Sequence, residues 1–269
     1  MNLELTQHRV VVTGGASGIG RATARAFAAE GADVAIWDLS SAGEEVAQEI
    51  RGEFGIRTLF VAADVAQQTS VEQATAQTVR DLGTIDHVVH AAAIGSGKYG
   101  FPFTNLEPAD WPRVLQVNIM GMVHVAHAVA PVMCQQAAGT MTFVASVAGQ
   151  IGSQTDPPYS ASKAANINFA QCLAKDLAPH GIRVNTLCPG MVPTALNRSV
   201  WQAWHDQAAP HERLEYDQWA MRKIRAVCPL GQWQTPEAIA DMLVFLSSAR
   251  AAFVTGQTIN VDGGFVMHW

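Results

Sequence analysis

Tyr159 and Lys163 stand four residues apart in the segment "PPYSASKAA", residues 157–165. Four residues make about one turn of an α-helix, so the two side chains would share a helix face. A phenol and an ammonium group on one face form either a proton-transfer pair or an ordinary solvated patch. A base that takes the proton of an alcohol needs a pKa near neutrality, and free tyrosine lies near 10. A neighbouring ammonium group favours the phenolate, so the pattern predicts a lowered pKa for Tyr159.

The elements that would hold this pair follow from the spacing of apolar residues. Short apolar runs alternate with longer Ala-rich stretches, as in proteins where helices cover both faces of a parallel sheet. We predict an α/β protein with a single-domain, Rossmann-type, doubly wound parallel sheet. The predicted strands are 9–14, 33–38, 57–64, 85–93, 139–146, 182–190 and 257–264, and the predicted helices are 20–31, 41–54, 67–83, 111–133, 160–181 and 236–248.

The length of 269 residues fits one large domain spanning 1–269. Residues 192–228 break the rhythm of strands and helices, and they include Trp201, Trp204 and Trp219. This segment follows the carboxyl end of a strand, where ligands bind in such folds, so we interpret it as an insertion over the site. The alternative is a solvated helical hairpin that packs only on itself.

A glycine-rich turn, "TGGASGIG", joins the first predicted strand to the first predicted helix, with glycines at 14, 18 and 20. Glycines let the chain turn tightly and let a phosphate approach the backbone, while the helix start offers free N–H groups to the anion. A simple connecting turn would not need so many glycines. The placement between strand and helix therefore indicates a dinucleotide site.

Asp38 ends the second predicted strand. A carboxylate there can accept hydrogen bonds from both ribose hydroxyls of adenosine, and it would repel a 2′-phosphate. The local sequence "WDLSS" holds no Arg or Lys to bind that phosphate. We therefore expect NAD rather than NADP, although Asp38 could also cap the next helix.

Several motifs occur together, in order, along nearly the whole chain. They are T-G-x-x-x-G-I-G at 13–20, Asp64 after the third strand, Asn118 in "LQVNIMG", Ser146 at a strand end, Y-x-x-x-K at 159–163 and "PGMVPT" at 189–194. In this combination the sequence resembles the short-chain dehydrogenase/reductase family.

The resemblance implies a role for each of four residues. Tyr159 would be the general acid/base, and Lys163 would lower its pKa while binding the nicotinamide ribose. Ser146 would orient the substrate oxygen, and Asn118 would help to hold a water that links Lys163 to solvent. The alternative for Asn118 is a buried helix asparagine that bonds nearby backbone, and for Ser146 a strand-end cap.

The resemblance also implies the contacts of the cofactor and the substrate. The residues expected at the cofactor are Gly14, Ser17, Gly18, Ile19, Gly20, Asp38, Leu39, Asp64, Val65, Ala91, Ala92, Tyr159, Lys163, Pro189, Gly190, Val192 and Thr194. Among them, Asp64 and Val65 would contact the adenine ring, and the backbone near Val192 and the Thr194 hydroxyl would meet the nicotinamide carboxamide. The residues expected at the substrate are Ser146, Gln150, Gln154 and Tyr159.

One stretch departs from the family pattern. "HAAA" at 90–93 replaces the usual N-N-A-G or N-A-A-G, so His90 stands for an asparagine and Ala93 for a glycine. In the family the asparagine ties the central strands together. A buried neutral imidazole both donates and accepts, so His90 could do the same. With Tyr159 present, His90 is a poor candidate for the catalytic base.

The bulk properties exclude several other functions. The net charge is −6, and no basic run suggests nucleic acid as a partner. The four cysteines form no C-x-x-C pair, and we expect no metal site. We see neither a signal peptide nor an apolar run of membrane-spanning length, so we expect no membrane partner and a cytoplasmic location.

The expected function is NAD-dependent hydride transfer between a secondary alcohol and a ketone. Polar residues in the loops favour a hydroxylated small molecule, such as a sugar, polyol, sugar acid or cyclic hydroxy compound. The alternatives are an NADPH-dependent carbonyl or 3-oxoacyl reductase and a non-catalytic NAD-binding scaffold. The resemblance further implies a homotetramer. Phe265, Val266, Met267 and Trp269 near the chain end would suit a partner surface if exposed, and the alternative is a tail folded back on its own domain.

Overall fold

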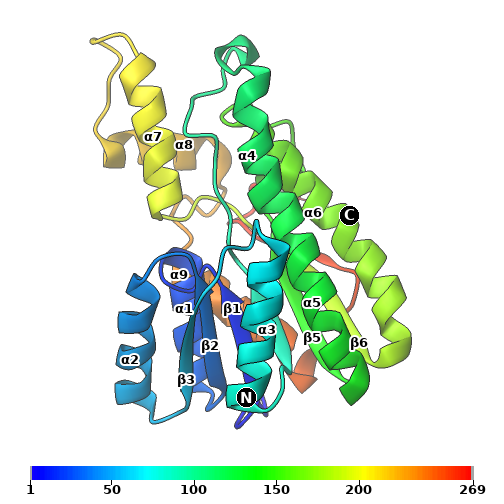
Figure 1. Cartoon of the computed structure of the whole chain (residues 1–269). Coiled ribbons are helices and arrows are strands. Elements are labelled where there is room, and N and C mark those ends of the chain that lie inside the picture. The colour runs from blue at the N-terminus through cyan, green and yellow to red at the C-terminus, as the bar shows by residue number, and fades with distance from the viewer. Residues whose placement is uncertain (1, 268–269) are drawn as a thin grey trace.

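The computed structural model describes residues 2–267, which are built around one seven-stranded sheet (Figure 1). All neighbouring strands run parallel, in the order β3-β2-β1-β4-β5-β6-β7. The strands are β1 (Arg9–Thr13), β2 (Asp33–Asp38), β3 (Thr58–Ala62), β4 (His87–His90), β5 (Gly139–Val144), β6 (Ile182–Pro189) and β7 (Thr258–Val261). The predicted doubly wound fold is confirmed. Its strand order reverses between β1 and β4, the place where such sheets bind ligands.

Helices cover both faces of the sheet and enclose two separate apolar cores. One core lies under α1 (Gly18–Ala29), α2 (Ala42–Phe54) and α9 (Pro236–Ser247). The other lies under α3 (Gln68–Leu82), α5 (Gly121–Gln136) and α6 (Pro157–Leu177). Successive strand residues alternate between them: Val11 belongs to the second core, and its neighbours Val10 and Val12 to the first.

Most predicted elements are present with shorter strands. The predicted strand 85–93 ends at His90 and the predicted strand 57–64 ends at Ala62, because the chain then leaves the sheet to form the loops of the site. Helix α6 begins at Pro157, three residues before the predicted start. Asp156 accepts a hydrogen bond from the Tyr159 N–H at its N-terminus, and proline suits the first helical position.

The helical stretch from Pro108 to Gln136 corrects one expectation. It includes α4 (Trp111–Leu115), a π-helical turn (Gln116–Met120) and α5. By length and composition alone these 29 residues, which include an 18-residue window with a mean hydropathy of 1.5, could cross a membrane. The prediction that no apolar segment reaches that length was therefore wrong. Val117, Val125 and Val129 of this stretch are buried in the core beside the sheet.

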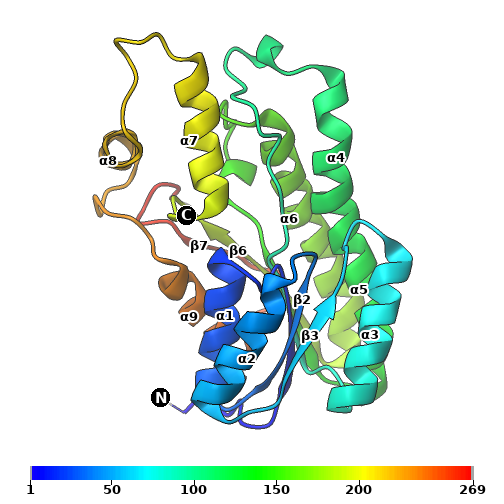
Figure 2. The same ribbon diagram turned by 60° about the vertical axis from the view of Figure 1, so that its left-hand side comes forward.

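The insertion forms two helices, α7 (Ala195–Gln207) and α8 (Tyr216–Val227), which stand beyond the carboxyl ends of the strands (Figure 2). An aromatic cluster that includes Trp201, Trp204, Tyr216 and Trp219 packs the helices together. Helix α7 also reaches the loop after β4, where Asn105 Nδ2 donates to Gln207 Oε1 at 3.1 Å. The hairpin therefore has its own small core and also borders the loops above the sheet.

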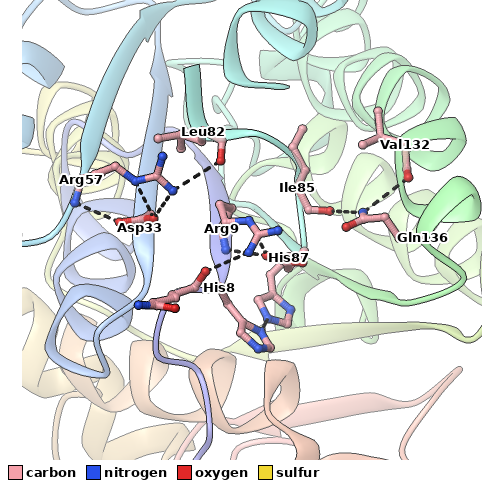
Figure 3. A network of polar contacts seen from close by, with 11 residues as sticks. His8, Arg9, Asp33, Arg57, Leu82, Ile85, His87, Val132 and Gln136 are labelled. Atoms are coloured by element: carbon pink, nitrogen blue, oxygen red, sulfur yellow. Dashed lines mark hydrogen bonds and ion pairs between the residues drawn. The ribbon is translucent and has the colours of Figure 1, made fainter. Parts of the chain in front are cut away.

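At the amino ends of the strands, opposite α7 and α8, a polar network connects the beginnings of neighbouring strands (Figure 3). Arg57 pairs with Asp33 at 2.6 Å, which links the beginnings of β2 and β3. His87 lies 2.8 Å from both His8 Nδ1 and Thr140 Oγ1 through its two ring nitrogens. Burial lowers the pKa of His87 to about 3, so this imidazole is neutral in the fold.

Candidate active site

The glycine turn has a geometry that side chains would block. Gly14 and Gly18 have φ angles of 67° and 51°, in the left-handed region. A β-carbon at Gly20 would overlap the carbonyl oxygen of Gly14, and one at Gly14 would lie 2.9 Å from the Ala92 Cα. Ser17, at the N-cap of α1, makes no side-chain cap bond. The first N–H groups of this helix are therefore available to an anion, as a dinucleotide phosphate requires.

Asp38 ends β2 beside this turn. Its Oδ2 accepts from the Ala16 N–H at 3.0 Å, and its Oδ1 accepts from the Ser40 N–H at 2.9 Å. The N-cap position of α2 belongs to Ser41, so Asp38 is not the helix cap that the sequence left open. The next residue, Leu39, is 68% exposed. Asp38 thus holds a carboxylate at the edge of the glycine turn; its contact with a ribose stays a prediction.

The residues expected near adenine follow β3. Asp64 Oδ1 accepts from the Ala66 N–H at 3.0 Å. Val65 is buried, and its carbonyl oxygen lies 2.8 Å from His124 Nδ1. These contacts fix the turn after β3. Ile19, another of the expected cofactor residues, packs partly buried against the core under α1.

The segments after β4 and β6 approach the glycine turn from two further strands. Ala91 and Ala92 donate their N–H groups to the carbonyl and hydroxyl oxygens of Thr13, each at 3.2 Å. A β-carbon at Gly18 would lie 3.4 Å from the Thr194 Cγ2. The ends of β1, β4 and β6 therefore converge on one place.

The segment after β6, which we expect to contact the nicotinamide, is held by backbone hydrogen bonds. Gly190, directly after Pro189, donates its N–H to the Val261 carbonyl at 3.2 Å, and the Thr194 N–H donates to the Val192 carbonyl at 2.9 Å. The Thr194 hydroxyl accepts from the Asn197 N–H at 3.3 Å, which makes it the N-cap of α7. The Thr194 hydroxyl predicted to meet the carboxamide is thus also used at the start of α7.

Ser146, just after β5, comes together with Tyr159 and Lys163 of α6. The Tyr159 hydroxyl is hydrogen-bonded to the Ser146 side chain. The Lys163 side chain is 2% exposed, and its Nζ lies 5.4 Å from the centre of the Tyr159 ring. That Nζ donates to the Val144 carbonyl oxygen at 2.7 Å. The end of β5 and the first turns of α6 thus assemble a phenol, a hydroxyl and an amine.

The electrostatics of this group differ from the sequence prediction. Burial raises the pKa of Tyr159 well above its ordinary value, and the hydrogen bond with Ser146 only partly offsets it. Burial also lowers the pKa of Lys163 to about 8. The predicted lowering of the Tyr159 pKa, which also counted on the positive charge of a bound nicotinamide ring, does not occur in the chain by itself, because desolvation dominates there.

Asn118 lies in the π-helical turn and is fully buried. Its Oδ1 accepts from the Ile94 N–H, and its Nδ2 donates to the Ile94 carbonyl and to Ser162 Oγ, each at 2.9 Å. The side chain therefore ties the loop after β4 to α6, the helix that carries Tyr159 and Lys163. This is the structural alternative raised from the sequence; the proton-relay role remains a prediction.

His90 links the two central strands. Its Nδ1 lies 2.9 Å from Thr13 Oγ1, and its ring packs edge-on against Phe143. Burial, together with the nearby charge of Lys163, lowers the pKa of His90 to about 3. A neutral imidazole thus makes the inter-strand bond that we anticipated from the family's asparagine.

The two glutamines expected at the substrate have different surroundings. Gln150 and Asn260 exchange two side-chain hydrogen bonds, at 2.7 and 3.0 Å. Gln150 therefore joins the loop after β5 to β7. Gln154 is exposed, in the turn before α6. Phe265 and Val266 pack partly buried against Ala145, Val147 and Cys188, so this part of the tail folds back; Met267 is 73% exposed, and Trp269 lies outside the described residues.

Sequence reasoning missed Asp156 and Cys188, both buried close to Tyr159. For Asp156 the signal was present, because an aspartate before Pro-Pro marks a helix start. For Cys188 no pattern distinguishes it from a core thiol. Among residues 2–267 no group of three or more His, Cys, Asp or Glu side chains could hold a metal ion.

The chain is similar to known proteins both in sequence and in structure. A family model described as enoyl-(acyl carrier protein) reductase matches residues 14–266. The 3-oxoacyl-[acyl-carrier-protein] reductase FabG of Chlamydia muridarum is 31% identical over 265 residues, which cover 98% of this chain and 99% of that protein.

Two solved structures are similar over the whole fold. L-sorbose reductase from Gluconobacter frateurii, complexed with NADPH and L-sorbose, superposes with a TM-score of 0.90 at 27% identity and full coverage of both chains. NAD+-bound xylitol dehydrogenase superposes with a TM-score of 0.89 at 29% identity, over 97% of this chain and 100% of that one. The two structures contain different nicotinamide cofactors, NADPH in the first and NAD+ in the second.

Proposed function

Because this chain belongs to the short-chain dehydrogenase/reductase family, whose members are oxidoreductases of alcohol and ketone groups, we propose that it uses NAD and acts on a polar, hydroxylated secondary alcohol or the matching ketone. The observation that carries this proposal is the assembly of Tyr159, Ser146 and Lys163 at the carboxyl edge of the sheet.

The three side chains divide the work of proton transfer. Ser146 holds the substrate oxygen beside the Tyr159 hydroxyl, which takes the proton during oxidation and returns it during reduction. When bound, the dinucleotide supplies the hydride acceptor or donor. Buried Lys163, with its Nζ 5.4 Å from the Tyr159 ring, binds the adjoining ribose and adds positive charge when protonated. Such charge favours the phenolate and works against the desolvation of Tyr159.

The test of this mechanism is Tyr159→Phe. The ring and its packing remain, so the variant should bind NAD with unchanged affinity, measured by fluorescence titration. Its turnover should fall by at least about 100-fold, the usual contribution of a general acid/base. Retained turnover would refute the mechanism. If neither protein turns over any alcohol while both bind NAD, the non-catalytic scaffold is the better description.

The preference for NAD is supported by Asp38. Its carboxylate lies beside the glycine turn, and no Arg or Lys occurs in residues 37–41 to hold a 2′-phosphate. The Asp38 carboxylate and the 2′-phosphate of NADP are both negative and would repel each other, so NADP should bind poorly. Steady-state rates with NAD and NADP should differ by more than about tenfold in kcat/KM, and Asp38→Ser should narrow the ratio. Equal rates would contradict this assignment.

The substrate class is supported by the polar loops and by the sugar and polyol enzymes among the similar structures. A panel of sugars, polyols, sugar acids and cyclic alcohols, followed by NADH absorbance, tests it. Activity confined to hydrophobic alcohols or acyl thioesters would contradict it.

A second candidate function is NADPH-dependent reduction of a 3-oxoacyl or other carbonyl compound. It is favoured by the 31% identity to a 3-oxoacyl-[acyl-carrier-protein] reductase over 98% of the chain. A 3-oxoacyl thioester with NADPH belongs in the same panel and discriminates the two proposals directly.

We also propose a cytoplasmic homotetramer that binds neither nucleic acid nor membrane. The support is the family resemblance and the net charge of −6. Light scattering after gel filtration would give the mass of the assembly, and a monomer at micromolar concentration would contradict it. Fractionation of the producing cells would test the location.

A further inference from the structure

Asp156 is a buried carboxylate at the edge of the catalytic group for which the proposed mechanism has no role. Its residue is 6% exposed. Oδ1 accepts from the Tyr159 N–H at 3.4 Å, and Oδ2 accepts from the Ser96 N–H at 2.8 Å. One side chain thus connects the first turn of α6 with the loop that follows β4.

The surroundings of Asp156 close it off from bulk water. A β-carbon at Gly95 would lie 2.8 Å from Asp156 Oδ2 and 3.3 Å from Leu196 Cδ1. The loop after β4, the start of α6 and the start of α7 therefore meet at this carboxylate. Close to the same point the Gly100 N–H donates to the Thr155 carbonyl at 2.9 Å, a second link between the loop and the residues just before α6.

No cation pairs with Asp156 to neutralise its charge in the described residues, and Tyr159 is its titratable neighbour on α6. On the loop, Lys98 Nζ is paired with Asp110 at 2.8 Å. On α7 the neighbour is the apolar Leu196. On α6 the titratable neighbour is Tyr159, beyond which Lys163 and Cys188 lie. No ion pair of Asp156 occurs in the described part of the chain.

We propose that Asp156 is a positioning residue for Tyr159, which it serves in two ways: its carboxylate fastens the first turn of α6 to the loop over the site, and its negative charge sets the pH range in which the phenol works. Burial is the main reason that the pKa of Tyr159 is high, and the charge of Asp156 adds to it. This inference rests on the proposed function of Tyr159.

The two roles can be separated by two substitutions. Asn caps helices about as well as Asp, so Asp156→Asn removes the charge and keeps the bond from the Tyr159 N–H, although its Nδ2 cannot accept from the Ser96 N–H. Loss of a neighbouring negative charge favours phenolate, so the rising limb of kcat/KM for alcohol oxidation should move about one pH unit lower. Asp156→Ala removes the fastening as well, so its kcat should also fall, by about tenfold, with a lower melting temperature.

Asp110→Asn is the matched control. It makes the same change of charge at another carboxylate that holds this loop, through its pair with Lys98, and Asp110 is not among the groups that shift the Tyr159 pKa. Its pH profile should coincide with that of the wild type. Rates would be measured from pH 6 to 10 with saturating NAD and the best alcohol of the panel.

The outcomes are distinct. The proposal is supported if the pH profile of Asp156→Asn shifts to lower pH while that of Asp110→Asn coincides with the wild type. A profile of Asp156→Asn that coincides with the wild type, or falls equally at every pH, overturns it and leaves only a structural role. Failure of the proposed function itself would show separately, as activity retained by Tyr159→Phe.

Discussion

His90 should make this protein sensitive to acid, and His90→Asn should relieve that sensitivity. Burial and the nearby charge of Lys163 lower the pKa of His90 from an ordinary value of 6.5 to about 3. The unfolded chain therefore binds a proton on this ring at a pH where the folded chain does not. The stability that depends on the neutral ring is present above pH 6.5 and is lost as the pH falls toward 3.

The size of the effect follows from the pKa difference. At pH 5, which is 1.5 units below 6.5 and well above 3, the native ring is still neutral and the unfolded ring is charged. Each unit corresponds to about 1.4 kcal/mol, so His90 costs about 2 kcal/mol of unfolding free energy at pH 5 relative to pH 8. Asn has no such titration, and its amide can bond Thr13 Oγ1 in place of Nδ1.

Urea unfolding of both proteins at pH 8 and pH 5 measures this difference. The smaller asparagine leaves a gap that lowers stability at both pH values alike, so only the change between them matters. His180→Asn, at an exposed histidine, is the control. The reasoning is refuted if the wild type and His90→Asn lose the same free energy between pH 8 and pH 5.

Three further substitutions test other contacts. Gly20→Ala would place a methyl group against a backbone carbonyl in the glycine turn; the unfolding free energy should fall by about 1–3 kcal/mol, and unchanged urea midpoints would contradict the close approach. Ser146→Ala should lower kcat by about 100-fold while the affinity for NAD, measured by titration, stays the same; an equal loss of NAD affinity would assign the hydroxyl to the cofactor. Gln150→Leu breaks both bonds to Asn260 and should speed amide hydrogen exchange after β7, whereas Gln154→Leu, at an exposed position, should not.

The sheet and its helices could be predicted because their signals are local. Strands such as Val10–Val12 are apolar on both faces since both faces are buried, and glycines end several helices where the sequence indicated. Strand ends were less accurate, because the point where β4 leaves the sheet is set by Thr13 and Asn118, which bond the segment that follows it.

Residue types and spacing were enough to predict which side chains form the site, but not their environment or their long-range contacts. Tyr159 and Lys163 were visible as a pair, but the pKa of the tyrosine depends on how much of the fold covers it. Asp156 and Ser96 are 60 residues apart, and Gln150 and Asn260 are 110 apart. Contacts of that kind arise from the closing of loops over the sheet, which no local pattern records.

The bond between Gln150 and Asn260 makes the two ends of this chain unequal as places for a fusion or an affinity tag. Asn260 Nδ2 also donates to the Val266 carbonyl at 3.1 Å, so the last described residues are held to the loop after β5. The amino end instead lies by the short helical turn that follows α9, where the Asn2 carbonyl accepts from Arg250 Nε at 2.9 Å, at the opposite end of the strands from α7 (Figure 2). A bulky group attached at the carboxyl end could displace the segment that holds the loop after β5, which includes Ser146. One attached at the amino end would leave that loop undisturbed, so purification of the native activity favours the amino end.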